Sequence, residues 1–250
     1  MGEALTGTEG VGALVINLRR SPQRWAATNA ALEGAGLGVE RIDALDARVE
    51  PTSSRYDARR NRATYFAPLK PAEIACFCSH RRAWERVVAL GRPMLVCEDD
   101  LEIDGDLVAT LEALKARFEG AAAVKLYAKR RPSGASETLG ASRLVRPRLV
   151  PLGCVAVWMT PGAATRYLAA SRTFHEPVDV FAQRLGAHGV ATWVLDPAPV
   201  REVSARLGGT TLAAPRRADG TRPLAPRILR ELRRPAFRAR LALDTWRGRR

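Results

Sequence analysis

Residues 93–100 read Pro93-Met94-Leu95-Val96-Cys97-Glu98-Asp99-Asp100, an apolar run that ends in three consecutive acids. The apolar run predicts a short buried strand. Adjacent carboxylates repel one another unless a cation lies among them or they reach solvent. Acids at the carboxyl end of a strand in an α/β sheet lie where such folds bind ligands, and Mg²⁺ or Mn²⁺ is often shared between carboxylates and substrate phosphates. The stretch therefore suggests a metal site. A solvated turn or helix cap is the alternative, because acids continue at Glu102, Asp104 and Asp106.

Strand and helix patterns alternate on both sides of this stretch. Residues 11–18 are apolar enough for a strand buried on both faces. Ser21-Pro22 then places a capping residue before a proline at the first position of a helix. The alternation predicts one α/β/α sandwich domain with a mostly parallel sheet over residues 11–205, after a flexible segment 1–10 and before an arginine-rich tail 206–250. Further strands are expected at 39–44, 122–127, 144–150, 153–159 and 190–195, helices at 71–90, 107–118, 161–171 and after 177, and irregular segments at 46–68 and 128–142.

The composition suggests a cytoplasmic protein. No apolar run reaches the roughly 18 residues that a membrane span requires, and the first residues lack the basic and apolar segments of a secretory signal. The cysteines lie in apolar segments without zinc-type spacing, and the pair two residues apart, Cys76 and Cys78, makes a poor ligand set. Buried reduced thiols are therefore expected, here and at Cys97 and Cys154.

The formal net charge of +14 is concentrated in the tail. Residues 215–250 hold twelve arginines and three acids, a balance of +9. Their apolar residues alternate with arginines, and Pro226 and Pro235 divide the segment into two predicted amphipathic helices. Such helices would suit the inner face of an anionic plasma membrane, as a peripheral attachment. The alternative is a helix packed on the main domain, and vesicle binding with and without residues 215–250 separates the two.

A nucleic-acid-binding protein is the main non-enzyme alternative, because this charge would give salt-dependent phosphate contacts. The sequence has no helix-turn-helix, zinc-finger or aromatic RNA-binding signature, and most of the excess charge is in the tail. Nucleic acid is therefore not the expected partner.

The predicted helix 71–90 carries two polar groups on its apolar stripe. On a wheel of 100° per residue, Glu73 and His80 project with Phe77, Trp84 and Val88. An unpaired buried carboxylate or imidazolium is costly, so each group needs a partner, and a shared cleft would supply one. The alternatives are a Glu73 that complements the helix dipole and a His80 that is a satisfied core histidine.

Four stretches of the chain, in order, resemble glycosyltransferase family 25, which includes bacterial lipooligosaccharide galactosyltransferases and animal procollagen galactosyltransferases. The resemblance spans residues 11 to about 200, and no single stretch decides it. The stretches are the opening strand and turn Val15–Arg24, the helix segment Pro71–His80 with Trp84, the acidic strand end Cys97–Asp100, and the weaker markers Lys125-Leu126 and Pro177-Val178-Asp179.

The resemblance implies a GT-A-like fold, a UDP-sugar or similar nucleotide-sugar donor, Mn²⁺ or Mg²⁺, and transfer of a hexose with inversion. Galactose is the expected sugar, and the expected acceptor is a glycan or a lipid-linked saccharide. Two departures from the family's sequence pattern leave a catalytically inactive family member as an alternative. Ala75 replaces a usual glycine, and residues 153–159 read Gly-Cys-Val-Ala-Val-Trp-Met where a Gly-Thr-Gly-Ala-Tyr type of run is expected.

Roles for individual residues follow from the same resemblance. Asp100 is the first choice as metal ligand and Glu98 addresses the metal or the ribose, because residues two apart face the same way along an extended chain. Asp99 completes the acidic set and supports the turn. The remaining assignments are Asp179 as catalytic base with Glu73 and His80 as further candidates, and Asn17, Leu18, Arg24 and Lys125 as nucleotide-binding residues.

Overall fold

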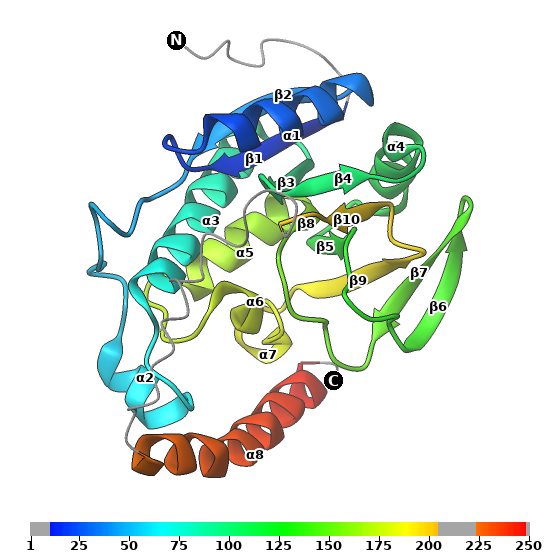
Figure 1. The fold of residues 1–250 in the computed structure, drawn as a ribbon. Helices are drawn as coiled ribbons and strands as arrows, with labels where there is room; N and C mark the ends of the chain where they lie inside the picture. The colour runs from blue at the N-terminus through cyan, green and yellow to red at the C-terminus, as the bar shows by residue number, and fades with distance from the viewer. Residues whose placement is uncertain (1–10, 205–223, 249–250) are drawn as a thin grey trace.

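The computed structural model describes residues 11–204 and 224–248. Its helices and strands alternate as predicted through most of the chain (Figure 1). In order, the elements are β1 (Gly12–Asn17), α1 (Pro22–Gly34), β2 (Gly38–Asp43), α2 (Ala58–Thr64), α3 (Pro71–Leu90), β3 (Met94–Glu98), β4 (Leu101–Ile103), α4 (Leu107–Arg117), β5 (Ala122–Lys125), β6 (Gly134–Leu139), β7 (Ser142–Pro147), β8 (Ala156–Met159), α5 (Pro161–Ala170), α6 (Val178–Phe181), α7 (Leu185–His188), β9 (Ala191–Asp196), β10 (Val200–Glu202) and α8 (Leu224–Arg247).

Eight strands form the central sheet in the order β2-β1-β3-β8-β5-β9-β7-β6. The pairs β1–β2, β1–β3 and β5–β9 are parallel, whereas β8 runs antiparallel to both β3 and β5, and β6, β7 and β9 are joined by antiparallel pairing. The sheet is therefore mixed, and the expected mostly parallel sheet is correct only for part of it. A loop without a helix, residues 148–155, leads from β7 to β8, and hydrophobic patterning does not reveal the direction of such a strand.

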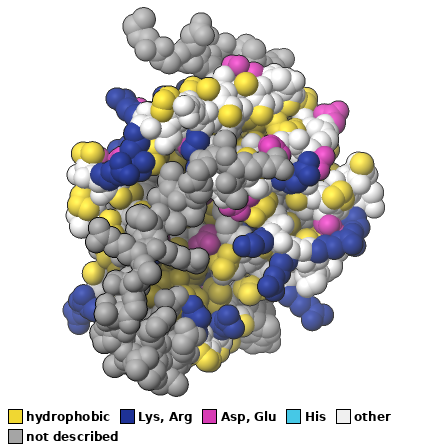
Figure 2. Space-filling view, viewed as in Figure 1, with side chains coloured by type: hydrophobic (Ala, Val, Ile, Leu, Met, Phe, Trp, Pro, Cys, Tyr) yellow, Lys and Arg dark blue, Asp and Glu magenta, His cyan; other side chains and the backbone are white. Residues whose placement is uncertain are grey.

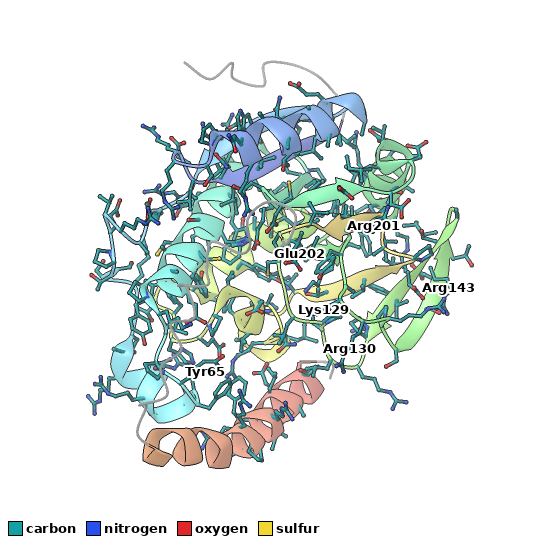
Figure 3. All side chains as sticks on the ribbon, in the orientation of Figure 1. Tyr65, Lys129, Arg130, Arg143, Arg201 and Glu202 are labelled. Carbon is teal, nitrogen blue, oxygen red and sulfur yellow. The ribbon has the colours of Figure 1, made fainter. Side chains whose placement is uncertain are left out.

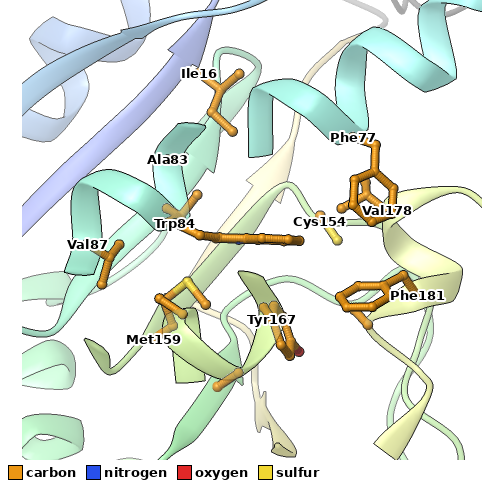
Figure 4. Close-up of a cluster of buried hydrophobic side chains, with 14 of the residues drawn as sticks. Ile16, Phe77, Ala83, Trp84, Val87, Cys154, Met159, Tyr167, Val178 and Phe181 are labelled. Atoms are coloured by element: carbon orange, nitrogen blue, oxygen red, sulfur yellow. The ribbon is translucent and has the colours of Figure 1, made fainter. Parts of the chain in front are cut away.

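Helices cover both faces of this sheet, which confirms the α/β class. Alternate residues of β1 enter opposite cores: Leu14 and Ile16 pack with the cluster under α3 and α5, and Ala13 and Val15 pack with the cluster under α1 and α4. Figure 4 shows the first core, where Trp84 of α3 lies among Met159, Tyr167 and Phe181. The rings of Trp84 and Tyr167 meet edge to face at 5.0 Å.

Two segments expected to be irregular contain regular structure. Residues 128–142 include β6, which pairs with β7 in a hairpin. Gly140 takes a positive φ of 58° in the turn, a conformation that glycine adopts without strain. Residues 46–68 include the short helix α2, whose first turn is capped by the Asp57 carboxylate accepting from the Arg60 amide. The short strands β4 and β10, which no pattern predicted, pair antiparallel outside the main sheet.

The C-terminal segment is one helix, α8, where two were predicted. Pro235 lies inside it, so the proline costs a hydrogen bond without ending the helix. The described side chains Phe237 and Leu241 are buried against Val180, with Tyr65 and Phe66 packed beside them. For this part of the tail the structure shows packing on the domain, and membrane attachment stays a prediction. The first tail residues, 206–223, lie outside the described residues, and no helix of the described chain is long and apolar enough to cross a bilayer.

Candidate active site

Three strands that run in the same direction bring polar residues to one edge of the sheet. Asn17, Glu98 and Lys125 are the last residues of β1, β3 and β5. The carboxyl ends of such strands form the usual ligand-binding edge of an α/β sheet. Figure 2 shows acidic side chains near the middle of the face that is turned to the viewer, with lysines and arginines beside them.

Asp99 is held by neighbouring side chains. Its Oδ2 accepts from Asn17 Nδ2 at 2.5 Å, and its Oδ1 accepts from Arg24 Nε at 2.8 Å. The Asn17 Oδ1 in turn accepts from Arg41 Nη2 at 2.6 Å, and the Leu18 carbonyl oxygen lies 3.4 Å from the same nitrogen. Each oxygen of Asp99 therefore accepts an N–H group of the protein, which fixes the side chain at the turn after β3, and its role as a metal ligand stays a prediction. The nucleotide-binding roles of Asn17, Leu18 and Arg24 stay predictions.

Asp100 has one free oxygen in a buried place. Its Oδ2 pairs with Arg24 Nη2 at 2.8 Å, while its Oδ1 is buried without a hydrogen-bond partner among the described residues. Burial, and then the nearby Glu98 carboxylate, raise the pKa of Asp100 to about 6, although Arg24 opposes the shift. A buried, partnerless carboxylate oxygen is a position that a cation would fill.

The three acids do not alternate as an extended chain would. Strand β3 ends at Glu98, so Asp99 and Asp100 both reach Arg24, whereas Glu98 faces helix α3. Glu98 Oε1 lies 3.3 Å from His80 Nε2. The chain bends directly after the strand, so Glu98 and Asp100 contact different partners, although the Glu98 carboxylate is still close enough to raise the pKa of Asp100.

Glu73 and His80 have separate partners, as the alternative interpretation of each residue allowed, and their candidate catalytic roles stay predictions. Glu73 Oε2 accepts from the Lys70 amide at 2.7 Å and so caps the start of α3. His80 is buried and finds Glu98 instead. The helical wheel placed both residues on one stripe correctly, but a glutamate at the third helical position has a capping partner within its own turn.

Asp179 and Lys125 approach the same edge from α6 and β5. Asp179 Oδ2 accepts from the Gly153 amide at 3.2 Å, and Oδ1 accepts from the Val180 amide at 2.9 Å. The Lys125 ammonium donates to the carbonyl oxygens of Pro151 and Gly153, and burial lowers its pKa although Cys154, Asp179 and Glu98 lie close enough to raise it. These contacts tie the loop before β8 to the acidic edge. The phosphate-binding role of Lys125 and the catalytic role of Asp179 stay predictions.

A sequence model of glycosyltransferase family 25, described as an LPS biosynthesis family, matches residues 11–144, which is more than half of the chain. The chain belongs to glycosyltransferase family 25. The acidic strand end, the capped helix α3 and the opening strand that carried the resemblance all lie inside the matched segment.

Curated family 25 proteins of animals are similar to parts of the chain. A "Glycosyltransferase 25 family member" of Drosophila pseudoobscura pseudoobscura is 33% identical over 97 residues, which are 36% of this chain and 16% of that protein. A "Probable inactive glycosyltransferase 25 family member 3" of Rattus norvegicus is 30% identical over 189 residues, which are 67% of this chain and 31% of that protein. The chain thus spans about a sixth to a third of the length of these relatives.

Sequence reasoning missed several residues near this edge of the sheet. Cys76 lies four residues before His80 on α3, and that spacing alone places both side chains on one face of the helix. Arg41, in the middle of β2, gave no signal in the sequence. Figure 3 labels two further basic residues, Lys129 and Arg130, in the exposed segment after β5.

Proposed function

We propose that this chain is an active family 25 glycosyltransferase of GT-A-like architecture. It would transfer a hexose, with galactose expected, from a UDP-sugar to a glycan or lipid-linked saccharide, with inversion and with Mn²⁺ or Mg²⁺. The observation that carries the proposal is the partnerless, buried Oδ1 of Asp100 at the ligand-binding edge of the sheet. Cytoplasmic localisation and attachment to the inner face of the membrane stay predictions.

The residues present suit a hard divalent cation. Asp100 Oδ1 lacks a hydrogen-bond partner among the described residues. The neighbouring Glu98 side chain is 27% exposed, so one of the two carboxylates is in contact with solvent. Asp100 and Glu98 would hold the ion, which supplies positive charge for the diphosphate that leaves the sugar. Arg24 and Asn17 contribute by fixing Asp99, and with it the turn that carries Asp100.

Transfer with inversion requires one group to take a proton from the acceptor hydroxyl. In our proposal Asp179 Oδ2 takes this proton as the acceptor oxygen bonds to the anomeric carbon and the bond from that carbon to the diphosphate oxygen breaks. The carboxylate is oriented for the task by the Gly153 and Val180 amides, which donate to its two oxygens. The same contacts also suit a purely structural aspartate, so Asp179 needs its own test.

The rat relative named as probably inactive makes loss of activity the second candidate function. In that case the acidic edge would be a remnant of the donor site. The presence of all three acids, with Asp100 left partnerless on one oxygen, favours an active enzyme.

Asp100→Asn tests the metal assignment. The variant should lose metal-dependent hydrolysis or transfer of the donor by about 100-fold or more, a loss typical of removing an electrostatic contact to a transition state. The matched control is Asp104→Asn. Asp104 belongs to the same acidic stretch, but it is exposed, and its Oδ2 forms a surface ion pair with Arg201 Nη2 at 3.5 Å. Thermal unfolding of each variant verifies the fold.

Asp179→Asn is the second arm of the same assay. It should abolish transfer while the variant still binds the donor in a metal-dependent way. Wild-type activity in Asp100→Asn would refute the metal assignment, and wild-type activity in Asp179→Asn would refute the assignment of the base.

A further inference from the structure

Cys76, His80 and Glu98 bring three potential metal ligands together beside the acidic edge. The thiol sulfur, the imidazole nitrogen and a carboxylate oxygen all lie within 4.8 Å of one another. Cys76 and His80 are one turn apart on α3, and Glu98 ends β3. Asp99 and Asp100 are not members of this cluster, because both turn toward Arg24.

The cluster has the dimensions of a transition-metal site. In a tetrahedral site with bonds of about 2.0–2.1 Å to nitrogen and oxygen, two ligand atoms are separated by about 3.4 Å. His80 Nε2 and Glu98 Oε1 are already 3.3 Å apart. The sulfur bond is longer, about 2.3 Å, so small side-chain rotations would bring Cys76 into the same shell.

The chemistry of these ligands selects a class of metal. A thiolate with an imidazole suits Zn²⁺ and similar first-row ions, whereas Mg²⁺ and Ca²⁺ take oxygen ligands. Three protein ligands leave one position open for water, as zinc sites of the catalytic type do.

The surroundings also suit a cation that arrives from solvent. Cys76 is partly buried and the Glu98 side chain is 27% exposed, so two of the three ligands reach the surface. Burial, and the nearby Asp179 and Glu73 carboxylates, raise the pKa of the Cys76 thiol, and the positive charge of a bound ion would offset this rise. The buried Lys125 is the nearby positive group.

We propose that Cys76 Sγ, His80 Nε2 and Glu98 Oε1 form a binding site for a zinc-class transition metal ion. This site shares Glu98 with the oxygen-ligand site at Asp100 and differs from it in its other ligands, Cys76 and His80. It does not depend on the proposed transferase activity.

Cobalt(II) is the probe, because its bond to a thiolate gives an intense near-ultraviolet charge-transfer band. The chelator-treated full chain should bind one equivalent of Co²⁺ with this band, and Zn²⁺ should displace it. Cys76→Ser should abolish the band. Cys78→Ser is the matched control, because Cys78 is a buried free thiol two residues along the same helix, and it should keep the band.

Two further measurements test the proposal even if Cys76→Ser folds poorly. His80→Gln and Glu98→Gln, which leave the thiol in place, should each weaken Co²⁺ binding at least tenfold. Excess Zn²⁺ should raise the unfolding temperature of the wild type and of Asp100→Asn, and should raise that of Cys76→Ser less than either. A wild type without the band, or a band that survives Cys76→Ser, would overturn the proposal. A band that survives in Asp100→Asn supports it even if that variant has lost transferase activity.

Discussion

Single side chains decide how the acidic edge is balanced. The Arg24 guanidinium contacts both Asp99 and Asp100, and all three side chains are buried. One positive charge therefore faces two carboxylates, with a third, Glu98, close by. Burial, and after it the Glu98 carboxylate, raises the pKa of Asp100 in spite of its ion pair, and the excess of negative charge is why a divalent cation would stabilise this edge.

A buried histidine predicts how the stability of the chain depends on pH. His188 packs against Tyr167 and Phe181, its Nδ1 accepts from the Val190 amide, and burial lowers its pKa to about 4. The unfolded chain binds this proton near pH 6.5, so the stability due to His188 is present above that pH and is lost as pH falls toward 4. Between pH 7 and pH 5 the loss should be about 2 kcal/mol.

His188→Asn isolates this contribution, because asparagine keeps an acceptor for the Val190 amide but does not titrate. Denaturant unfolding at pH 7 and pH 5 should show a decline about 2 kcal/mol smaller in the variant than in the wild type. His175, whose pKa burial also lowers to about 4, should continue to lower the stability of the variant in the same range. An equal decline in the variant and the wild type would show that His188 is not responsible.

The position of a site residue was predictable only where the end of a strand or the face of a helix determines it. The strand end predicted Glu98 and Asp100 at the edge of the sheet, and helical spacing placed His80 toward the interior. Hydrogen bonds decided the remaining positions. Glu73 accepts from the Lys70 amide at the start of its own helix, whereas Asp99 accepts from Asn17 and Arg24, which are 82 and 75 residues away in the sequence. Sequence spacing carries no information about such distant partners.

At the scale of elements, the fold was predictable where a segment has one strong periodicity. The bounds of β1, α1 and α3 lie within a residue or two of those expected. The sequence did not predict the direction of β8, nor the existence of β4, β6 and β10, because antiparallel pairing depends on partners elsewhere in the chain. Pro235 likewise suggested a helix end that tertiary packing overrides in α8.

The packing of α8 can be measured with one pair of variants. Phe237 is buried and meets Tyr65 and Phe66 edge to face, with the Arg184 guanidinium 5.7 Å from its ring centroid. Phe237→Ala should lower the free energy of unfolding by about 3 kcal/mol, as expected for a buried phenylalanine. Leu243→Ala is the control on the same helix, because Leu243 is 44% exposed and its loss should cost about 0.5 kcal/mol or less. Equal effects in denaturant unfolding would mean that α8 does not use this face to pack.

At the scale of the whole molecule, charge and family point to different partners. The net charge of +14 alone suits any polyanion, whereas the family 25 match and the acidic edge suit a nucleotide sugar. A basic surface does not conflict with an acidic site, since most of the excess charge is in residues 215–250. In our proposal the two partners differ in what their binding would require: a nucleotide sugar would need the metal, and a nucleic acid would need low salt.

A thermal-unfolding screen of UDP-sugars and other nucleotide sugars, with and without Mn²⁺, separates these partners. A ligand at 100 times its Kd adds about 2.7 kcal/mol to the stability, which is a shift of roughly 5–10 °C for a chain of this size. The donor should produce this shift only with Mn²⁺, and Asp100→Asn should lose it while Asp104→Asn keeps it. If no nucleotide sugar shifts the transition, and the chain instead binds single-stranded or duplex oligonucleotides with an affinity that falls linearly with the logarithm of salt concentration, its partner is a nucleic acid and the transferase proposal is wrong.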